Sequence, residues 1–179
     1  MKTVPTQRKD VSLSIVAGVC LLLFTVTSDA APPRNTQPPD ALDITLEAGI
    51  ACPDFDVRIQ SEGPAAQVNK EFFDQSGNVV RMLSAGRGWD LTFTNVQTGA
   101  LLAVKGNGSV SHTSVGADGV MTVSSTGHNG LIMFSTDIPP GPTSTLYSGR
   151  IVYTIDANFI TTLKQTSGKS TDICAVLAG

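Results

Sequence analysis

Apolar and polar residues alternate in several short segments of the chain. The segments 55–60, 89–94 and 147–155 each place apolar side chains at every second position, with mostly polar residues between them. A period of two residues puts one kind of side chain on each face of a β-strand. From Cys52 onward, no window keeps the helical period over ten or more residues. The sequence therefore predicts an all-β fold.

Turn-forming sequences separate these segments at short and fairly even spacing. The dipeptide Asn107-Gly108 is suited to a two-residue hairpin turn and predicts that 100–106 pairs with 109–114. The tripeptides at 75–77 and 117–119 predict three-residue hairpin loops with a glycine in the left-handed conformation. Further breaks are expected at 96–99, 127–130 and 156–158, and in a stiff surface loop at 139–142.

Strands that are joined by such short loops must be antiparallel neighbours, because a parallel connection needs a dozen or more residues. The sequence thus predicts an antiparallel meander of about nine or ten strands. A meander leaves two exposed edges, and closing it into an up-and-down barrel removes both. We expect a closed or nearly closed barrel, with a two-sheet β-sandwich as the alternative.

Residues 1–30 have the layout of a secretory signal peptide, with a charged start, an apolar stretch over 11–26 and an end made of small residues. Cleavage is predicted between Ala30 and Ala31, because small residues precede that bond. The alternative is an N-terminal anchor that stays on the chain. The protein is accordingly expected to be secreted, either extracellular or associated with the cell envelope, and to have no membrane span after processing.

The segment 31–40 contains four prolines and offers almost nothing apolar to bury. Proline fixes φ and removes a backbone donor, so this segment is predicted to be a flexible tether. Residues 41–179 remain as one β domain, which is long enough to bury a core of its own.

Two cysteines, Cys52 and Cys174, remain after the predicted signal peptide. An even pair in an exported chain is expected to form a disulfide. This bond would hold the first and last strands side by side and so close the meander. Two separate buried thiols or a bridge between molecules are the alternatives.

Charge and metal-ligand spacing exclude some classes of function. A formal net charge of −3 disfavours a nucleic-acid partner. Neither cysteine has a second ligand at zinc-binding spacing, so no metal and no cofactor is predicted. Asp54 and Asp56 form a D-x-D motif, but the glycine and distant Glu of a calcium loop are missing, so a solvated strand edge is the preferred interpretation.

Only two histidines are available as a catalytic base. In the predicted hairpins His112 faces Ser124 on one side and Ala103 on the other, and no carboxylate flanks it. His128 is expected to lie in a polar turn. The sequence therefore predicts no catalytic residues, although enzymatic activity stays open.

Four aromatic residues are large enough to line the interior of a small barrel. These candidate ligand-binding residues are Trp89, Phe93, Tyr147 and Tyr153. A barrel of about eight strands either fills itself with side chains or holds one small ligand. Plain core packing is the alternative to a site for a small apolar molecule.

The stretches 91–95, 146–156 and 172–177 together resemble a group of small secreted all-β proteins of actinobacteria that have no assigned activity. The resemblance covers about residues 50–177 and implies a secreted single-domain β protein. It assigns no role to any residue.

These observations favour a secreted, non-enzymatic β domain that binds a small apolar molecule or a component of the cell envelope. The alternative is a small barrel enzyme, similar to a cyclase or isomerase, that acts on an apolar substrate in its lumen.

Overall fold

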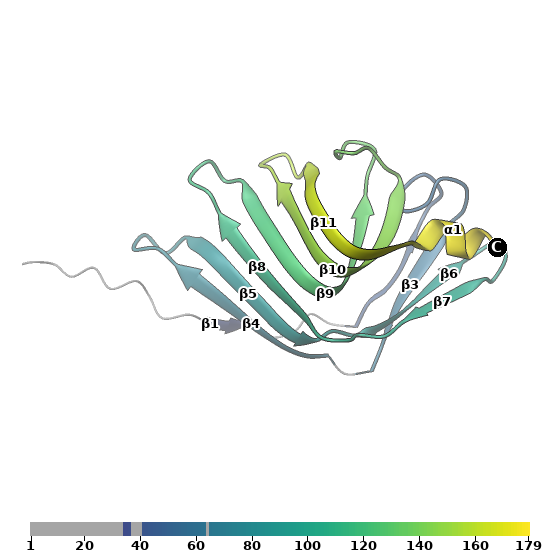
Figure 1. The fold of residues 1–179 in the computed structure, drawn as a ribbon, viewed down its shortest axis with the longest axis horizontal. Helices are drawn as coiled ribbons and strands as arrows, with labels where there is room; N and C mark the ends of the chain where they lie inside the picture. Colours follow the sequence, from purple (N-terminus) through teal and green to yellow (C-terminus); the bar gives the residue numbers. More distant parts are fainter. Residues whose placement is uncertain (1–33, 37–40, 64) are drawn as a thin grey trace, which may run out of the picture.

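The computed structural model describes residues 34–36, 41–63 and 65–179, which contain eleven strands and one short helix (Figure 1). The strands are β1 (Arg34–Thr36), β2 (Asp43–Leu46), β3 (Val57–Glu62), β4 (Ala66–Phe73), β5 (Val79–Arg87), β6 (Asp90–Asn95), β7 (Leu101–Val104), β8 (Ser109–Val115), β9 (Met121–Met133), β10 (Thr143–Ile155) and β11 (Thr161–Asp172). The helix α1 (Ile173–Ala178) follows β11 directly. The prediction of an all-β fold is confirmed.

The strands form two antiparallel sheets. Sheet A has the order β1-β4-β5-β8-β9-β10-β11, and sheet B has the order β2-β3-β6-β7. Two very short described connections, at 88–89 and 105–108, carry the chain between the sheets. Each of the pairs β5–β6 and β7–β8 is therefore one long strand with a bend in it. The two sheets are the two arms of one bent ribbon of strands (Figure 1).

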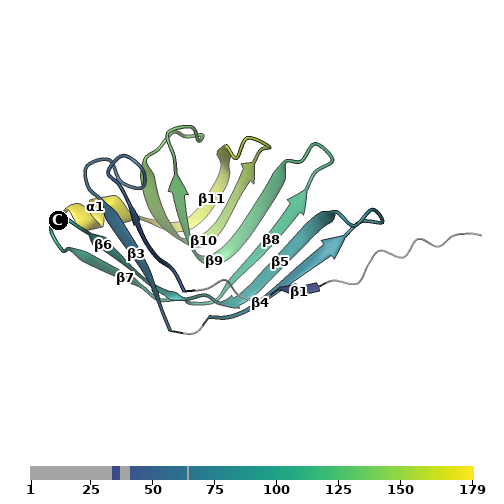
Figure 2. The same cartoon turned by 180° about the vertical axis from the view of Figure 1, so that it is seen from behind.

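No closed barrel is present in the described residues, so the two-sheet alternative fits better than the predicted barrel. The edges of sheet A are β1 and β11, the edges of sheet B are β2 and β7, and no pairing joins these edges within the part of the chain that the structure describes. The ribbon instead folds so that sheet B and α1 face the C-terminal end of β9, around Ile132, and the N-terminal end of β10, around Leu146 (Figure 2). We call these the near ends of β9 and β10.

The hairpin predicted at Asn107-Gly108 is wrong. β7 pairs with β6, whereas β8 pairs with β5 and β9, so β7 and β8 lie in different sheets. Asn107-Gly108 lies in the bend that carries the chain from sheet B to sheet A. The dipeptide does mark a change of chain direction, but its local preference does not determine which strand becomes the neighbour.

The two three-residue hairpin loops are confirmed. β4 and β5 are joined through 75–77, where Gly77 has a φ of +84° and the Asp74 carboxylate accepts two backbone hydrogen bonds at 2.8 Å. β8 and β9 are joined through 117–119, where Gly119 has a φ of +78°. In both loops glycine supplies the left-handed conformation that other residues adopt only with strain.

The expected breaks at 96–99, 139–142 and 156–158 all fall between strands. The expected break at 127–130 is wrong, because β9 continues through it without interruption. The two glycines in that segment are part of the strand, and one of them belongs to a row of glycines across sheet A.

This glycine row consists of Gly86, Gly127, Gly149 and Gly168, on β5, β9, β10 and β11. Gly86 pairs with Ser109 of β8, which pairs with Gly127, and the row continues through Gly149 to Gly168. All four glycines have φ between +92° and +151°. A Cβ atom on any of them would overlap a carbonyl oxygen of a neighbouring segment. The row therefore permits a close backbone approach that lets the sheet curve.

The main core lies between sheet B, α1 and the near ends of β9 and β10. Its largest apolar members are Phe55, Val57, Ile59, Phe93, Ile173 and Leu177. Ile132 of β9 and Leu146 of β10 pack against it from sheet A. Two buried polar side chains connect its parts: Ser144 Oγ donates to the Ala51 carbonyl at 2.8 Å, and the Asn95 amide donates to the Leu177 carbonyl at 3.2 Å.

A second buried group lies on the other face of sheet A. Ile151 of β10 is directly opposite Ser125 of β9, and both are buried, as are Val123 and Tyr147 on the same face. The curved sheet thus buries apolar side chains on both of its faces, each in a different part of the ribbon.

The loop between β9 and β10 is fixed to the start of β11 by one buried carboxylate. Asp137 is 3% exposed and accepts hydrogen bonds from the amides of Phe134 at 2.6 Å and Thr161 at 2.7 Å. The proline-containing loop is therefore held in place by backbone donors from two segments, which satisfies the buried charge.

Cys52 and Cys174 form a disulfide with a Cα–Cα distance of 5.5 Å, as predicted. Its expected position is wrong, because it joins the β2–β3 loop to α1 and does not hold the first and last strands together. The helix escaped prediction because six residues are too few to show a helical period. The available signal was Asp172, whose carboxylate caps the helix by accepting from the Ala175 amide at 3.0 Å.

Loss of the disulfide should destabilise the fold strongly. The bond spans 122 residues of sequence, and a loop of that size corresponds to about 4–5 kcal/mol of unfolding free energy in the chain-entropy model. We expect a loss of this order in the Cys52→Ala/Cys174→Ala variant, measured by urea unfolding. Reduced wild-type protein is the control for packing changes. An unfolding midpoint equal to that of the oxidised protein would contradict the expectation.

The glycine row can be tested with two glycines on the same strand. Gly127→Ala introduces a Cβ into a carbonyl oxygen at positive φ and should lower the free energy of unfolding by about 1–3 kcal/mol. A Cβ at Gly130 meets nothing within 4 Å, so Gly130→Ala should leave the stability unchanged or raise it slightly. Thermal or urea unfolding of both variants measures the difference, and equal losses would disprove the role of the row.

Candidate functional site

Two adjoining cavities lie between sheet B and the near ends of β9 and β10. The bend cavity, of about 220 Å³, lies beside the bends between the sheets and has Trp89, Leu91, Phe93 and Leu146 in its apolar wall. The wedge cavity, of about 240 Å³, is lined by residues that include Leu42, Ile59, Leu131, Ile132 and Ile173. Leu91, Phe93 and Gly130 line both cavities. The two cavities therefore share part of their walls, and we call the pair the groove.

The alternation of the strands explains why these side chains meet. Leu91 and Phe93 are two residues apart on β6, so they point to the same side of sheet B. Leu146 of β10 is paired with Gly130 of β9, which places both on one face of sheet A. Gly130 has no side chain and open space at its Cβ position, so its backbone forms part of the wall of both cavities.

The bend cavity also has four polar side chains in its wall, from Gln67, Asn107, Ser109 and His128. None of the four makes a side-chain hydrogen bond to another residue that the structure describes. The wedge cavity is lined by apolar side chains and by Gly130. The groove is therefore polar at one end and apolar at the other.

Asp90 connects two of the bends at the polar end of the groove. Its carboxylate accepts from the Gly106 amide at 2.8 Å, from Lys105 Nζ at 2.9 Å and from the Arg87 guanidinium at 3.1 Å. The Gly106 amide, followed by the two cations, lowers the pKa of this carboxyl well below its usual range. These contacts join the β5–β6 connection to the β7–β8 connection and hold the wall of the bend cavity.

The structure separates the four predicted ligand-binding aromatics into two pairs. Trp89 and Phe93 line the bend cavity, and Phe93 lines the wedge cavity as well. Tyr147 and Tyr153 lie on the other face of β10, because Tyr147 is the neighbour of Leu146 along the strand. Burial raises the pKa of the Tyr153 hydroxyl. The four residues therefore do not surround one space, and ligand binding by Trp89 and Phe93 stays a prediction.

The histidines differ in how well the sequence placed them. His112 faces Ser124, as predicted, but its partner on the other side is Leu83 and not Ala103. His128 lies within β9 and lines the bend cavity, so its prediction as a turn residue is wrong. Gly127 and Gly130, on either side of His128, are typical of a turn. The sequence therefore did not indicate that this histidine lines the groove.

The D-x-D motif has a structural role at one of its two positions. The Asp56 carboxylate accepts from the Ala48 amide at 2.8 Å, whereas Asp54 is exposed and makes no side-chain hydrogen bond to another described residue. Across the described ranges, no three His, Cys, Asp or Glu side chains are grouped so that they could hold a metal ion.

The predicted signal peptide, including the cleavage site at Ala30 and Ala31, lies outside the described residues. Part of the predicted tether 31–40 is described, and there Arg34–Thr36 form β1 and pair with Asn69–Glu71 of β4. At these three positions the segment is therefore a strand at the edge of sheet A and not a free tether.

The pH dependence of folding should report the interactions of Asp90. The pKa of Asp90 in the folded protein lies below the ordinary value of an Asp side chain. The interactions of the Asp90 carboxylate therefore stabilise the fold fully above the ordinary pKa, and this stabilisation is lost as the pH falls toward the folded pKa. We expect the free energy of unfolding to fall between about pH 5 and about pH 3, with a smaller slope in Asp90→Asn. Urea unfolding at several pH values measures this, with Asp54→Asn as the control. Identical slopes in all three proteins would refute it.

No family model, curated protein or solved structure matches this chain. The resemblance to small secreted proteins of actinobacteria therefore stays a prediction. The helix that the structure describes is too short to cross a membrane.

Proposed function

We propose that this chain is a non-enzymatic binding module that holds one small, largely apolar molecule in the groove between its sheets. The observation that supports this most directly is that the bend and wedge cavities share Leu91, Phe93 and Gly130 in their walls. Ligand sites are concave and mostly apolar, with a few polar groups that fix orientation. The groove has this composition.

The size of the groove agrees with a small ligand. Cavities of about 220 Å³ and about 240 Å³ are each below the range of roughly 300–1,000 Å³ that ligand pockets usually have. Taken together, the two adjoining cavities are within that range. A molecule that occupied both parts would contact Leu91 and Phe93 along its length.

The walls of the groove are held by interactions that exist without a ligand. Asp90 fixes the bends beside the polar end. The disulfide fixes α1 at the apolar end, where Ile173 lines the wedge cavity. A preformed site loses less conformational entropy when it binds, which favours affinity for a small molecule.

The structure offers little support for the alternative of a barrel enzyme. The described residues enclose no barrel lumen, and none of the residues that line the two cavities carries a carboxylate. His128 therefore has no acidic partner in the groove to orient it as a general base. We therefore propose binding without chemistry.

Placement outside the cytoplasm is part of the same proposal. The predicted signal peptide over 1–30 and the disulfide both support a secreted or cell-envelope protein, because disulfides persist in oxidising compartments. The ligand would then be a small molecule of the surroundings or a component of the envelope.

Filling the groove should weaken binding. The chain has one tryptophan, so quenching of Trp89 fluorescence by 2-bromododecan-1-ol, which carries its bromine next to the hydroxyl head, reports entry into the bend cavity. Gly130 has open space at its Cβ and no positive φ, so Gly130→Leu should fold normally and fill the space at this shared wall. We expect saturable quenching of the wild type and at least about tenfold weaker binding by the variant, since about 1.4 kcal/mol of lost contact is enough.

The matched control is Thr122→Leu, which adds the same side chain to an exposed position of the same strand. It should bind the bromoalcohol as the wild type does. Quenching that does not saturate, or equal affinity in wild type and Gly130→Leu, would rule out the groove as the site.

A further inference from the structure

We infer that the ligand of the groove is an amphiphile with a single anionic head group, such as a carboxylate, and an apolar tail. The head would lie in the bend cavity beside Lys105 and His128, and the tail would lie in the wedge cavity. This inference rests on the proposed function and names its ligand class.

Hydrogen-bonding capacity is concentrated at one end of the groove. Gln67, Asn107, Ser109 and His128 reach the bend cavity from β4, the β7–β8 connection, β8 and β9. Each of these side chains can donate a hydrogen bond, and none is used by another described residue. A ligand that covers these donors without accepting from them would leave them unsatisfied, which costs free energy. A head group with several acceptor oxygens avoids that cost.

The charged side chain that lines the bend cavity, Lys105, favours an anion. Arg87 and Lys105 pair with Asp90, and Glu62 of β3 lies directly opposite Asp90, so these four groups balance and the preference comes from Lys105 alone. The Lys105 side chain is 74% exposed and lines the cavity, so its ammonium group is accessible to a ligand. No carboxylate lines the cavity to oppose it.

The apolar end determines the orientation of the ligand. The wedge cavity is formed by aliphatic and aromatic side chains and by Gly130. A charged head in this part of the groove would lose its hydration without gaining a hydrogen bond, which is strongly unfavourable. An apolar tail gains free energy there because its surface leaves water.

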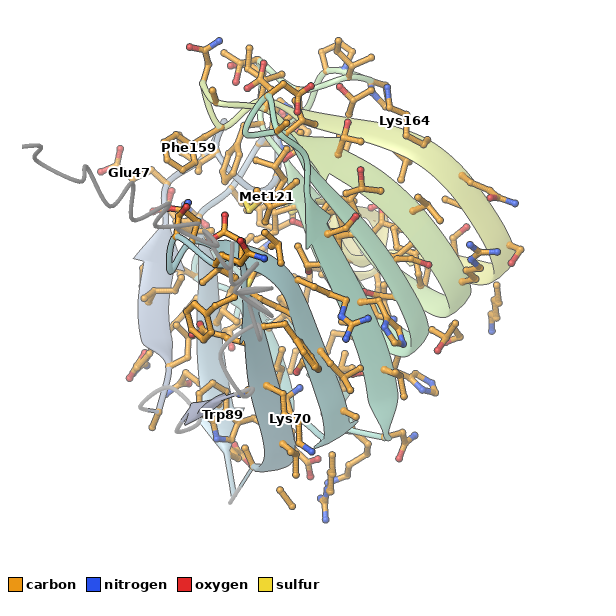
Figure 3. The ribbon with its side chains drawn as sticks, turned by 90° about the vertical axis from the view of Figure 1, so that its left-hand side faces the viewer. Glu47, Lys70, Trp89, Met121, Phe159 and Lys164 are labelled. Carbon is orange, nitrogen blue, oxygen red and sulfur yellow. A yellow bond between two sulfur atoms is a disulfide. The ribbon has the colours of Figure 1, made fainter. Side chains whose placement is uncertain are left out.

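Figure 3 shows that Trp89 lies at the end of the strands opposite to Phe159. Trp89 lines the bend cavity, next to Lys105. Its fluorescence is therefore sensitive to a ligand that fills this part of the groove, and three brominated probes with the same tail can be compared.

The probes are 2-bromododecanoate, 2-bromododecan-1-ol and 2-bromododecyltrimethylammonium, which carry the bromine next to the head group and so beside Trp89, each titrated below its micelle concentration. We expect the carboxylate to bind about fivefold more tightly than the alcohol, which is the effect of one partly screened charge. The ammonium probe should bind more weakly than the alcohol, because it meets a positive charge. Lower affinity for the carboxylate at high salt should accompany this order.

A lysine variant tests where the preference comes from. Lys105→Met removes the ammonium and keeps an apolar stem, and Asp90 retains the Gly106 amide and Arg87 as partners. We expect the ratio of carboxylate to alcohol affinity to fall about fivefold in the variant. Lys169→Met, at an exposed position on β11, is the control and should behave as the wild type.

The outcomes separate the two proposals. If the three probes quench Trp89 with equal affinity, or if the ammonium probe binds best, the anionic head is wrong and the proposed function stands. If none of the probes gives saturable quenching, the groove does not bind such molecules and both proposals fall. Because the comparison of probes uses the wild type, it does not depend on the folding of any variant.

Discussion

The backbones of neighbouring strands approach one another along the glycine row more closely than side chains would permit. Gly127, Gly149 and Gly168 each lie where a Cβ atom would overlap a carbonyl oxygen of a neighbouring segment. This constraint accounts for the curvature of sheet A, since a strand that carried a Cβ at these positions would have to move away. The rest of the architecture depends on that curvature.

A bent ribbon buries apolar residues on both of its faces without closing into a barrel. One face forms the main core with α1, and the other buries the group around Ile151. The groove lies where sheet B and the near ends of β9 and β10 diverge beside that core. It is therefore a product of the bend, and the residues that hold the bend, such as Asp90, also hold its polar wall.

The sequence predicted those features that depend on neighbouring residues. The alternation in 89–94 and 147–155 identified most of β6 and part of β10, and the glycine loops at 75–77 and 117–119 identified two hairpins with the correct pairing of His112 and Ser124. Asn107-Gly108 misled the interpretation, because a turn between strands and a bend within one strand require the same residues.

The groove itself was only partly predictable. Trp89 and Phe93 were identified by their size and alternation, but His128 stands between glycines that indicated a turn. The contributions of Leu146, Lys105 and Gly130 depend on which distant strands become neighbours, and one sequence holds no direct record of that. The cysteine pair was identified because its chemistry does not depend on the topology, whereas its location in a helix and a loop does.

The position of the disulfide has a consequence for the order of assembly. Cys52 precedes Cys174 by 122 residues, so during synthesis its thiol emerges long before its partner and before β3 to β11 exist to shield it. The hairpins of sheet A consist mostly of contacts between residues that are close in sequence, so they can form early. The main core beside α1 includes a contact between residues that are far apart in sequence, so it forms later. We therefore expect the hairpins to form before the disulfide, and the part of the fold that contains the groove to become rigid last.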